Sequence, residues 1–233
     1  MTTPLLSVRN LNAFYGRAHI LFDLELEIAR GEVVALMGRN GAGKSTTLKA
    51  LMGLLEGTRG EIAFAGRDAA RLAPFQRARL GMGFVPEDRR VFTELTVLQN
   101  LETGRQPPRK GAPQWTPQAL FDLFPNLGAM PDRPGGRMSG GEQQMLTIAR
   151  TLMGNPHLVL LDEPSEGVAP VIVEQMANMI LRLKQAGMAV LLCEQNFHFA
   201  RLVSDRAYLL DHGRIAYHGE LDGAQAHQSL SAA

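Results

Sequence analysis

Residues 33–55 constrain the fold more than any other part of the chain. This segment starts with five apolar residues, 33–37, passes through a glycine-rich stretch that matches G-x-x-x-x-G-K-[ST] without a gap, and continues as a helical pattern from Lys44. The match lies between a predicted buried strand and a predicted helix, which is the context that the pattern requires. The sequence therefore predicts an α/β fold with a phosphate-binding loop at the start of a helix.

Each residue type in this loop suits a nucleoside triphosphate. Glycines let backbone N–H groups curl around phosphate oxygens, and the helix N-terminus adds partial positive charge. Lys44 can reach the β- and γ-phosphates, and the hydroxyl of Ser45 can ligate Mg²⁺. ATP and Mg²⁺ are therefore the expected cofactors, and Lys44 is also expected to act in catalysis. The predicted nucleotide-binding residues of the loop are Gly38, Arg39, Asn40, Gly41, Ala42, Gly43, Lys44, Ser45 and Thr46.

Composition indicates a soluble globular protein. Of 233 residues, 45% are hydrophobic and 20% are charged, and the formal net charge is +1. So small a charge gives no overall basic field for nucleic acid. The single cysteine, Cys193, lies in an apolar run and is expected to be a buried, unreactive thiol. No apolar run approaches the ~20 residues of a membrane span, the N-terminus lacks a secretory-signal pattern, and the six histidines show no metal-ligand spacing.

Hydrophobic periodicity predicts two kinds of strand, with helices between the strands of the second kind. Apolar residues alternate with acidic ones from Phe22 to Ile28, which predicts a half-buried strand of an antiparallel sheet. Continuous apolar runs predict buried parallel strands, and helical patterns lie between them. Predicted strands are 5–11, 22–28, 33–37, 61–64, 158–161, 189–193, 207–210 and 215–217; predicted helices are 44–55, 96–103, 117–124, 140–153, 171–185 and 197–203.

The expected architecture is a single α/β domain over residues 5–221. Its P-loop NTPase core, of the RecA-like type, carries an N-terminal antiparallel β subdomain and a helical insert at about 88–153. Loops are expected at 104–116 and 125–138, where proline, glycine and polar residues gather. The tail at 222–233, rich in alanine, glutamine and serine, is expected to be poorly ordered.

Two carboxylates follow the predicted strand 158–161. A buried strand places Asp162 at its carboxyl end, where α/β sheets bind ligands. Asp162 suits a Mg²⁺ shell, and Glu163 is positioned to act as general base toward the attacking water. An acidic pair after a strand more often begins a turn or a helix, but the phosphate loop in the same chain favours the catalytic interpretation.

The run Ser139, Gly140, Gly141, Glu142 has two compatible interpretations. A serine followed three residues later by glutamate is a capping box at a helix start. Two glycines beside that cap also let a phosphate approach the backbone closely, which would make the helix start an anion site.

The order of these motifs resembles the ATP-binding subunits of ABC transporters, over about residues 5–220. The motifs are the phosphate loop, the signature 139–143 and the run 160–164 that contains Asp162 and Glu163. The resemblance implies a dimer with two ATP molecules, in which the signature of one subunit closes over ATP on its partner's phosphate loop. It also implies that Tyr15 stacks on adenine, although a half-buried aromatic at a strand end would explain Tyr15 without the family.

Four positions depart from the common family pattern: Glu87, Glu142, Ala169 and Gln195. The resemblance places Glu87 where a glutamine normally senses the γ-phosphate and contacts the membrane subunit, so Glu87 is a further candidate nucleotide-binding residue and Mg²⁺ ligand. Gln195 replaces the switch histidine; its amide can donate and accept hydrogen bonds but cannot titrate, so we assign it positioning and leave base chemistry to Glu163.

Together the departures resemble the LivF-type subunits of branched-chain amino-acid importers. Such importers pair LivF-type and LivG-type ATP-binding subunits with two membrane permeases and a periplasmic binding protein. The resemblance implies a peripheral protein at the cytoplasmic face of the inner membrane, soluble when isolated, that hydrolyses ATP to power uptake. Alternatives are an importer of urea or short amides, an ABC-type ATPase outside transport, a non-hydrolytic nucleotide sensor, and pairing of the chain with itself.

Overall fold

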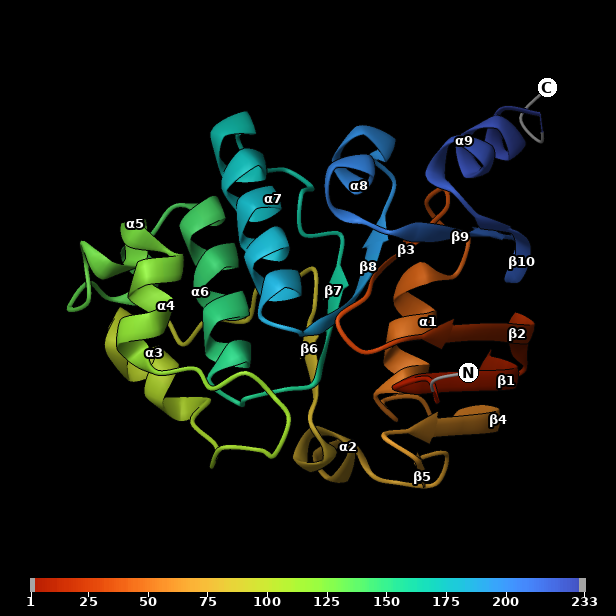
Figure 1. Cartoon of the computed structure of the whole chain (residues 1–233), viewed down its shortest axis with the longest axis horizontal. Helices are drawn as coiled ribbons and strands as arrows, with labels where there is room; N and C mark the ends of the chain where they lie inside the picture. The colour runs from red at the N-terminus through yellow and green to blue at the C-terminus, as the bar shows by residue number, and fades with distance from the viewer. Residues whose placement is uncertain (1–2, 231–233) are drawn as a thin grey trace.

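Two β-sheets form the framework of the structure, a computed structural model that describes residues 3–230 (Figure 1). The first sheet is antiparallel, with strand order β2-β1-β4-β5. The second has the order β10-β9-β3-β8-β7-β6, and its strands are parallel except for β10. The strands are β1 (Leu6–Tyr15), β2 (Ala18–Ile28), β3 (Val33–Met37), β4 (Gly57–Phe64), β5 (Arg67–Asp68), β6 (Met82–Val85), β7 (Leu158–Asp162), β8 (Ala189–Glu194), β9 (Arg206–Asp211) and β10 (Arg214–Gly219).

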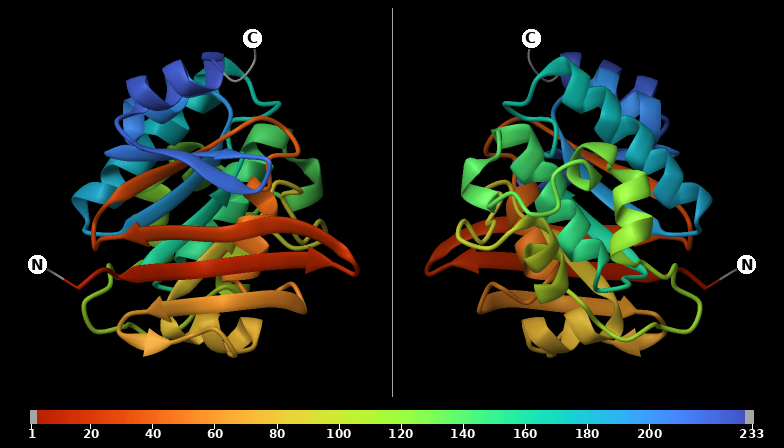
Figure 2. Two further views of the ribbon diagram at one scale, coloured as in Figure 1. Left: turned by 90° about the vertical axis from the view of Figure 1, so that its right-hand side faces the viewer. Right: turned by 90° about the vertical axis from the view of Figure 1, so that its left-hand side faces the viewer.

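Helices cover both faces of the parallel sheet, and α1 lies between the two sheets (Figure 1). Helices α3 to α6 gather on the far side of β6 from the antiparallel sheet. Figure 2 shows β1, β2 and β4 side by side, with α8 and α9 at the opposite end of the molecule. The helices are α1 (Lys44–Leu51), α2 (Pro74–Leu80), α3 (Val97–Thr103), α4 (Pro117–Leu123), α5 (Pro125–Gly128), a 3₁₀ turn (Gly135–Arg137), α6 (Gly140–Leu152), α7 (Pro170–Gln185), α8 (Phe197–Val203) and α9 (Leu221–Leu230).

The continuous apolar runs serve two cores at once. Along β7, Leu158 and Leu160 pack toward α1 and the antiparallel sheet, whereas Val159 and Leu161 pack toward α6 and α7. A strand that is buried on both faces needs apolar residues at every position, so it loses the alternation seen in β2. In the sheet, Asp162 pairs with Cys193 of β8 and therefore lies at the same carboxyl edge as the phosphate loop after β3.

The predicted fold class is confirmed, and β3 and α8 have the predicted bounds. Other elements were wrong in detail. The region 125–138, expected as a loop, contains α5 and the 3₁₀ turn, and α1 ends at Leu51 rather than 55. Residues 221–230 form helix α9 in place of the expected poorly ordered tail, because Leu221 and Ala224 are buried against β3, β9 and α8. Residues 231–233 of that tail lie outside the described part of the chain.

One buried guanidinium joins α1 to α2. Arg77 is 2% exposed and donates to the carbonyl oxygens of Ala50 (2.8 Å), Leu51 (2.7 Å), Ala70 (2.8 Å) and Leu72 (2.9 Å). The first two carbonyls belong to the C-terminal turn of α1, where a cation is favoured. We expect Arg77→Ala to lower the free energy of unfolding by about 3 kcal/mol, because it leaves buried carbonyls without donors.

Urea unfolding followed by circular dichroism measures this loss. Arg79→Ala is the matched control, since Arg79 lies on the same helix but is exposed and only stacks on the Phe75 ring. This control is expected to change stability by less than about 1 kcal/mol. Equal losses for the two variants would contradict the role given to the Arg77 hydrogen bonds.

Candidate functional site

The phosphate loop joins the end of β3 to the start of α1. Its shape requires glycine at both ends: a Cβ on Gly38 would lie 2.5 Å from the carbonyl oxygen of Leu210, and Gly43 has φ 113° with the Leu21 side chain 2.8 Å from its Cβ position. In this conformation the Lys44 Nζ donates to the carbonyl oxygens of Gly38 (2.8 Å) and Arg39 (3.1 Å). The Lys44 ammonium group thus lies against the backbone of the loop, where phosphates are expected to bind.

Lys44 also forms an ion pair with Glu163. Nζ lies 3.0 Å from Oε1, and the two side chains are 3% and 7% exposed. The other carboxylate oxygen of Glu163 accepts a hydrogen bond of 2.6 Å from Nε2 of Gln195. Glu163 has φ 45°, an uncommon value outside glycine, and its N–H donates to the carbonyl oxygen of Cys193. The structure therefore brings together all three residues that the sequence predicts to be catalytic.

These contacts set the charge of Glu163. Burial acts to raise its pKa, but hydrogen bonds from Glu166, Gln195 and Lys44 outweigh burial, so the pKa of Glu163 lies below its ordinary value. The carboxylate is therefore charged at neutral pH and able to accept a proton. Glu166, which sequence reasoning missed, shares a hydrogen bond with Glu163; this bond and burial raise the pKa of Glu166 to about 7.

The predicted magnesium ligands lie beside this cluster. The Ser45 hydroxyl donates to Oδ1 of Asp162 at 2.9 Å. Burial raises the pKa of Asp162 to about 6, and the charges of Glu87 and Glu163 add to the rise. A hydroxyl and clustered carboxylates are hard oxygen donors, and Mg²⁺ is commonly held by one or two such groups together with phosphates. The residues present therefore fit a Mg²⁺–nucleotide site.

The raised pKa predicts how the protein without metal or nucleotide responds to pH. Because the folded state holds the Asp162 proton more tightly than the unfolded chain does, this group stabilises the fold below pH ~4 and loses that contribution as pH rises through about 6. We expect Asp162→Asn to raise the free energy of unfolding at pH 8 by about 1–3 kcal/mol in EDTA. Unfolding followed from pH 4 to 8 checks this; a variant less stable than the wild type at pH 8 would contradict it.

A pocket of about 360 Å³ opens over the phosphate loop. Its lining combines loop residues with Glu87, which follows β6, and with Glu163 and Glu166. Tyr15 does not line it: the ring lies at the end of β1 and is 46% exposed. The loop residues in the lining are Asn40, Gly41, Gly43, Lys44, Ser45 and Thr46.

The signature residues form the start of α6, away from this pocket. The capping box predicted there is present: the Ser139 N–H donates to Oε2 of Glu142 at 2.7 Å, and the Ser139 hydroxyl accepts from the Glu142 N–H at 3.4 Å. Arg89 lies against Gly140, and Ile172 lies against Gly141. Within one chain, therefore, the structure does not bring the signature onto the phosphate loop.

A family model described as ABC transporter matches residues 21–166, and the chain belongs to this family. It is 42% identical, over 92% of each chain, to the high-affinity branched-chain amino acid transport ATP-binding protein BraG of Pseudomonas aeruginosa. It is 36% identical to the probable branched-chain amino acid transport ATP-binding protein LivF of Archaeoglobus fulgidus, over 97% of this chain and 96% of that one.

Other relatives differ in the cargo that their names state. The lipopolysaccharide export system ATP-binding protein LptB of Haemophilus influenzae is 34% identical, over 91% of this chain and 88% of that one. The fold is similar to that of a nucleotide-free ATP-binding cassette from an ABC transporter, with a TM-score of 0.81 at 26% identity, over 98% of this chain and 96% of that one. Across residues 3–230, no helix combines the length and apolar character that a bilayer crossing requires. The chain is thus an ABC ATPase subunit in sequence and in fold.

Proposed function

We propose that this chain binds ATP with Mg²⁺ and hydrolyses it to power an importer of branched-chain or related hydrophobic amino acids. The observation that carries the ATPase activity is the contact of Glu163 with both Lys44 and Gln195, beside the Ser45–Asp162 pair. The relatives named for branched-chain amino-acid transport, at 42% and 36% identity, support the solute class.

The contacts suggest how each group acts. Lys44 is bound to carbonyl oxygens and to Glu163, and it can exchange these partners for the β- and γ-phosphates. That exchange frees Glu163 to accept a proton from the attacking water, and Gln195 orients the carboxylate through its amide. Ser45 and Asp162, with Glu87 nearby, would hold Mg²⁺, which when bound would neutralise charge on the phosphates.

A second ATP-binding subunit completes each site in this proposal. The capped, glycine-lined start of α6 presents backbone N–H groups to a phosphate held by the partner. The partner is a LivG-type subunit or a second copy of this chain. Tyr15, exposed at the end of β1, is proposed to stack on adenine.

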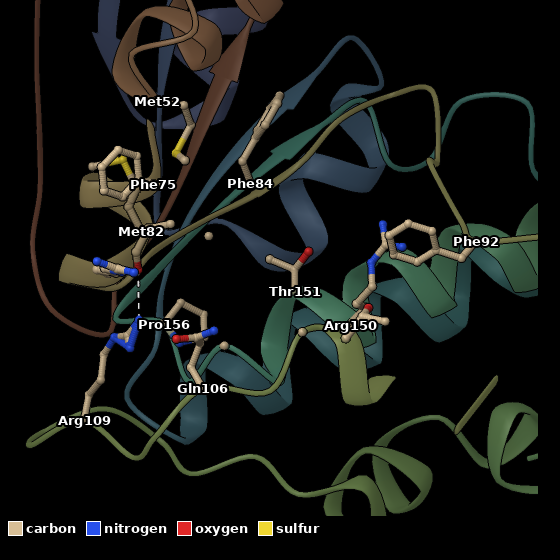
Figure 3. A pocket seen from close by; sticks show the side chains of 16 residues that line it. Met52, Phe75, Met82, Phe84, Phe92, Gln106, Arg109, Arg150, Thr151 and Pro156 are labelled. Carbon is tan, nitrogen blue, oxygen red and sulfur yellow. Dashed lines mark hydrogen bonds between the residues drawn. The ribbon is translucent and has the colours of Figure 1, made fainter. Parts of the chain in front are cut away.

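A groove of about 590 Å³ separates α2 from α6 and is proposed to receive a membrane permease (Figure 3). Phe75 and Phe92 lie on opposite sides of it and are 58% and 51% exposed. Arg150 stacks on the Phe92 ring and donates to the carbonyl oxygen of Arg90, in the segment that follows Glu87. A shift of Glu87 and the segment after it can therefore be transmitted through Arg150 to Phe92 in the groove. The subunit would then work as a peripheral protein at the cytoplasmic face of the inner membrane.

Reconstitution tests the proposed function. The chain, with a LivG-type partner, two permeases and a binding protein in vesicles, is expected to drive ATP-dependent uptake of radiolabelled leucine. Uptake of urea or short amides in place of leucine would reassign the solute, and ATP hydrolysis without uptake would favour work outside transport. No hydrolysis at all would overturn the ATPase assignment and leave a nucleotide sensor.

A further inference from the structure

Glu194 is a buried carboxylate for which sequence reasoning gave no role. It is the last residue of β8, beside β7 and β3, and it is 2% exposed. Three backbone N–H groups converge on it: Ser165 donates to Oε1 at 3.1 Å, and Gln195 and Asn196 donate to Oε2 at 3.2 and 3.4 Å. A carboxylate placed this deep is costly, so its hydrogen bonds must offset a substantial desolvation penalty.

In the described part of the chain, hydrogen-bond donors and no cation stabilise this carboxylate. Among residues 3–230, no lysine, arginine or histidine forms an ion pair with Glu194. Burial raises the pKa of Glu194, and hydrogen bonds from Ser165, Asn196 and Gln195 oppose that rise. Because the two oxygens accept from backbone N–H groups of both loops, and the Ser165 side chain adds a further hydrogen bond, the carboxylate fixes the separation of those loops.

Each loop carries one member of the catalytic pair. Ser165 follows Glu163 by two residues, and Gln195 directly follows Glu194. The loops meet again through the N–H of Glu163, which donates to the carbonyl oxygen of Cys193 at 3.0 Å, and through the 2.6 Å bond from Gln195 to Glu163. The bond from Gln195 to Glu163 thus joins side chains of two loops, and the backbone of each loop is hydrogen-bonded to Glu194.

We propose that Glu194 is a positioning residue for hydrolysis, which keeps the Gln195 amide on the Glu163 carboxylate by holding both loops. This inference rests on the proposed ATPase function. Gln195 is half-buried and directly follows β8, and its long side chain can adopt several rotamers, so the position of its backbone limits where its amide can go. A displacement of about 1 Å at such a contact is enough to lower a rate about 100-fold.

Glu194→Gln tests the proposal because it keeps the size of the side chain and turns one acceptor into a donor. The new amide NH₂ must point at a backbone N–H group of one of the two loops. Two donors cannot hydrogen-bond each other, so the bond to that loop is lost. In steady-state ATPase assays with the partner subunit present, we expect kcat to fall about 10- to 100-fold while KM for ATP stays within about twofold. Glu61→Gln, an exposed glutamate on β4, is the matched control and is expected to keep wild-type kinetics.

A double-mutant cycle separates positioning from a merely structural role. If Glu194 acts through Gln195, Glu194→Gln is expected to lower kcat less than about threefold when Gln195 is already alanine. Glu194→Asp, which keeps the charge but retracts it by one methylene, is carried through the same cycle and replaces Glu194→Gln if that variant does not fold.

Unchanged kcat in an active enzyme, or equal losses in both backgrounds, would overturn the positioning role. Absence of turnover in the wild type would instead overturn the proposed function, and this inference with it.

Discussion

Replacing Glu163 with glutamine is expected to reduce steady-state ATP turnover by about 10²- to 10⁴-fold, the range that a general base contributes. The charge of Glu163 is the reason. Its hydrogen bonds, including that from Gln195, lower its pKa and keep the carboxylate ready to accept a proton, whereas a glutamine amide has no such capacity. Phosphate release in the reconstituted transporter measures the effect.

Nucleotide binding is the internal control for this variant. Glu163→Gln removes the ion-pair partner of Lys44 but keeps the lysine, the loop glycines and the Ser45–Asp162 pair, so ATP affinity is expected to stay within a few-fold of that of the wild type. The variant should therefore accumulate ATP without turning it over. Unchanged turnover would remove Glu163 from the role of base and direct attention to Glu166, which lines the same pocket.

Lys44→Ala is expected to have the second large effect, a loss of ATP affinity of about 100-fold or more. Charged hydrogen bonds to phosphate are each worth ~1.5–3 kcal/mol, and the lysine is positioned to form two. The same substitution removes the partner of a carboxylate that is 7% exposed. We therefore also expect the nucleotide-free protein to lose about 3 kcal/mol of stability, since an unpaired buried charge is strongly destabilising.

The double variant Lys44→Ala/Glu163→Gln separates these two effects. Neutralising Glu163 removes the unpaired charge, so most of the lost stability is expected to return while ATP affinity stays low. Thermal unfolding and nucleotide titration measure the two quantities. Equal stability of Lys44→Ala and the wild type would mean that the 3.0 Å ion pair contributes nothing to the fold.

The core of the fold could be predicted because its signals are local. Unbroken apolar runs mark strands that are buried on both faces, and β3 begins and ends where its run does. Short or irregular elements gave no such signal. Strand β6 has four residues, with a glycine in its interior. Helix α2 has seven residues, of which four are exposed and one, Arg77, is buried.

Helix α9 was mispredicted for a related reason. Its sequence mixes four apolar residues with polar ones, and of the side chains that the structure describes in it only Leu221 and Ala224 are buried. Small alanines and glycine among polar residues give too weak a periodicity to indicate a helix, so the tertiary contacts with β9 and α8 decide the structure.

The site, like the fold, has residues that the sequence could predict and contacts that it could not. Motif spacing predicted the phosphate loop, Asp162 and Glu163, because each follows a strand that ends at one sheet edge. Spacing could not predict the ion pair of Lys44 with Glu163, which joins residues far apart in the chain. It also missed Glu194, whose surroundings are backbone N–H groups that no residue type reveals. The roles of Tyr15 and of the signature stay predictions, because neither Tyr15 nor residues 139–142 line the pocket over the phosphate loop.

The position of α9 has a practical consequence for how this protein is handled. Residues near its end and the phosphate loop border one pocket: Gln228 lines it together with Arg39 and Asn40. Shortening the chain to residue 220 would uncover the apolar surface under Leu221 and remove one wall of that pocket. Affinity tags and fluorescent fusions at the C-terminus are therefore best joined through a flexible spacer. The spacer keeps them from displacing α9 from the core and from blocking the phosphate loop.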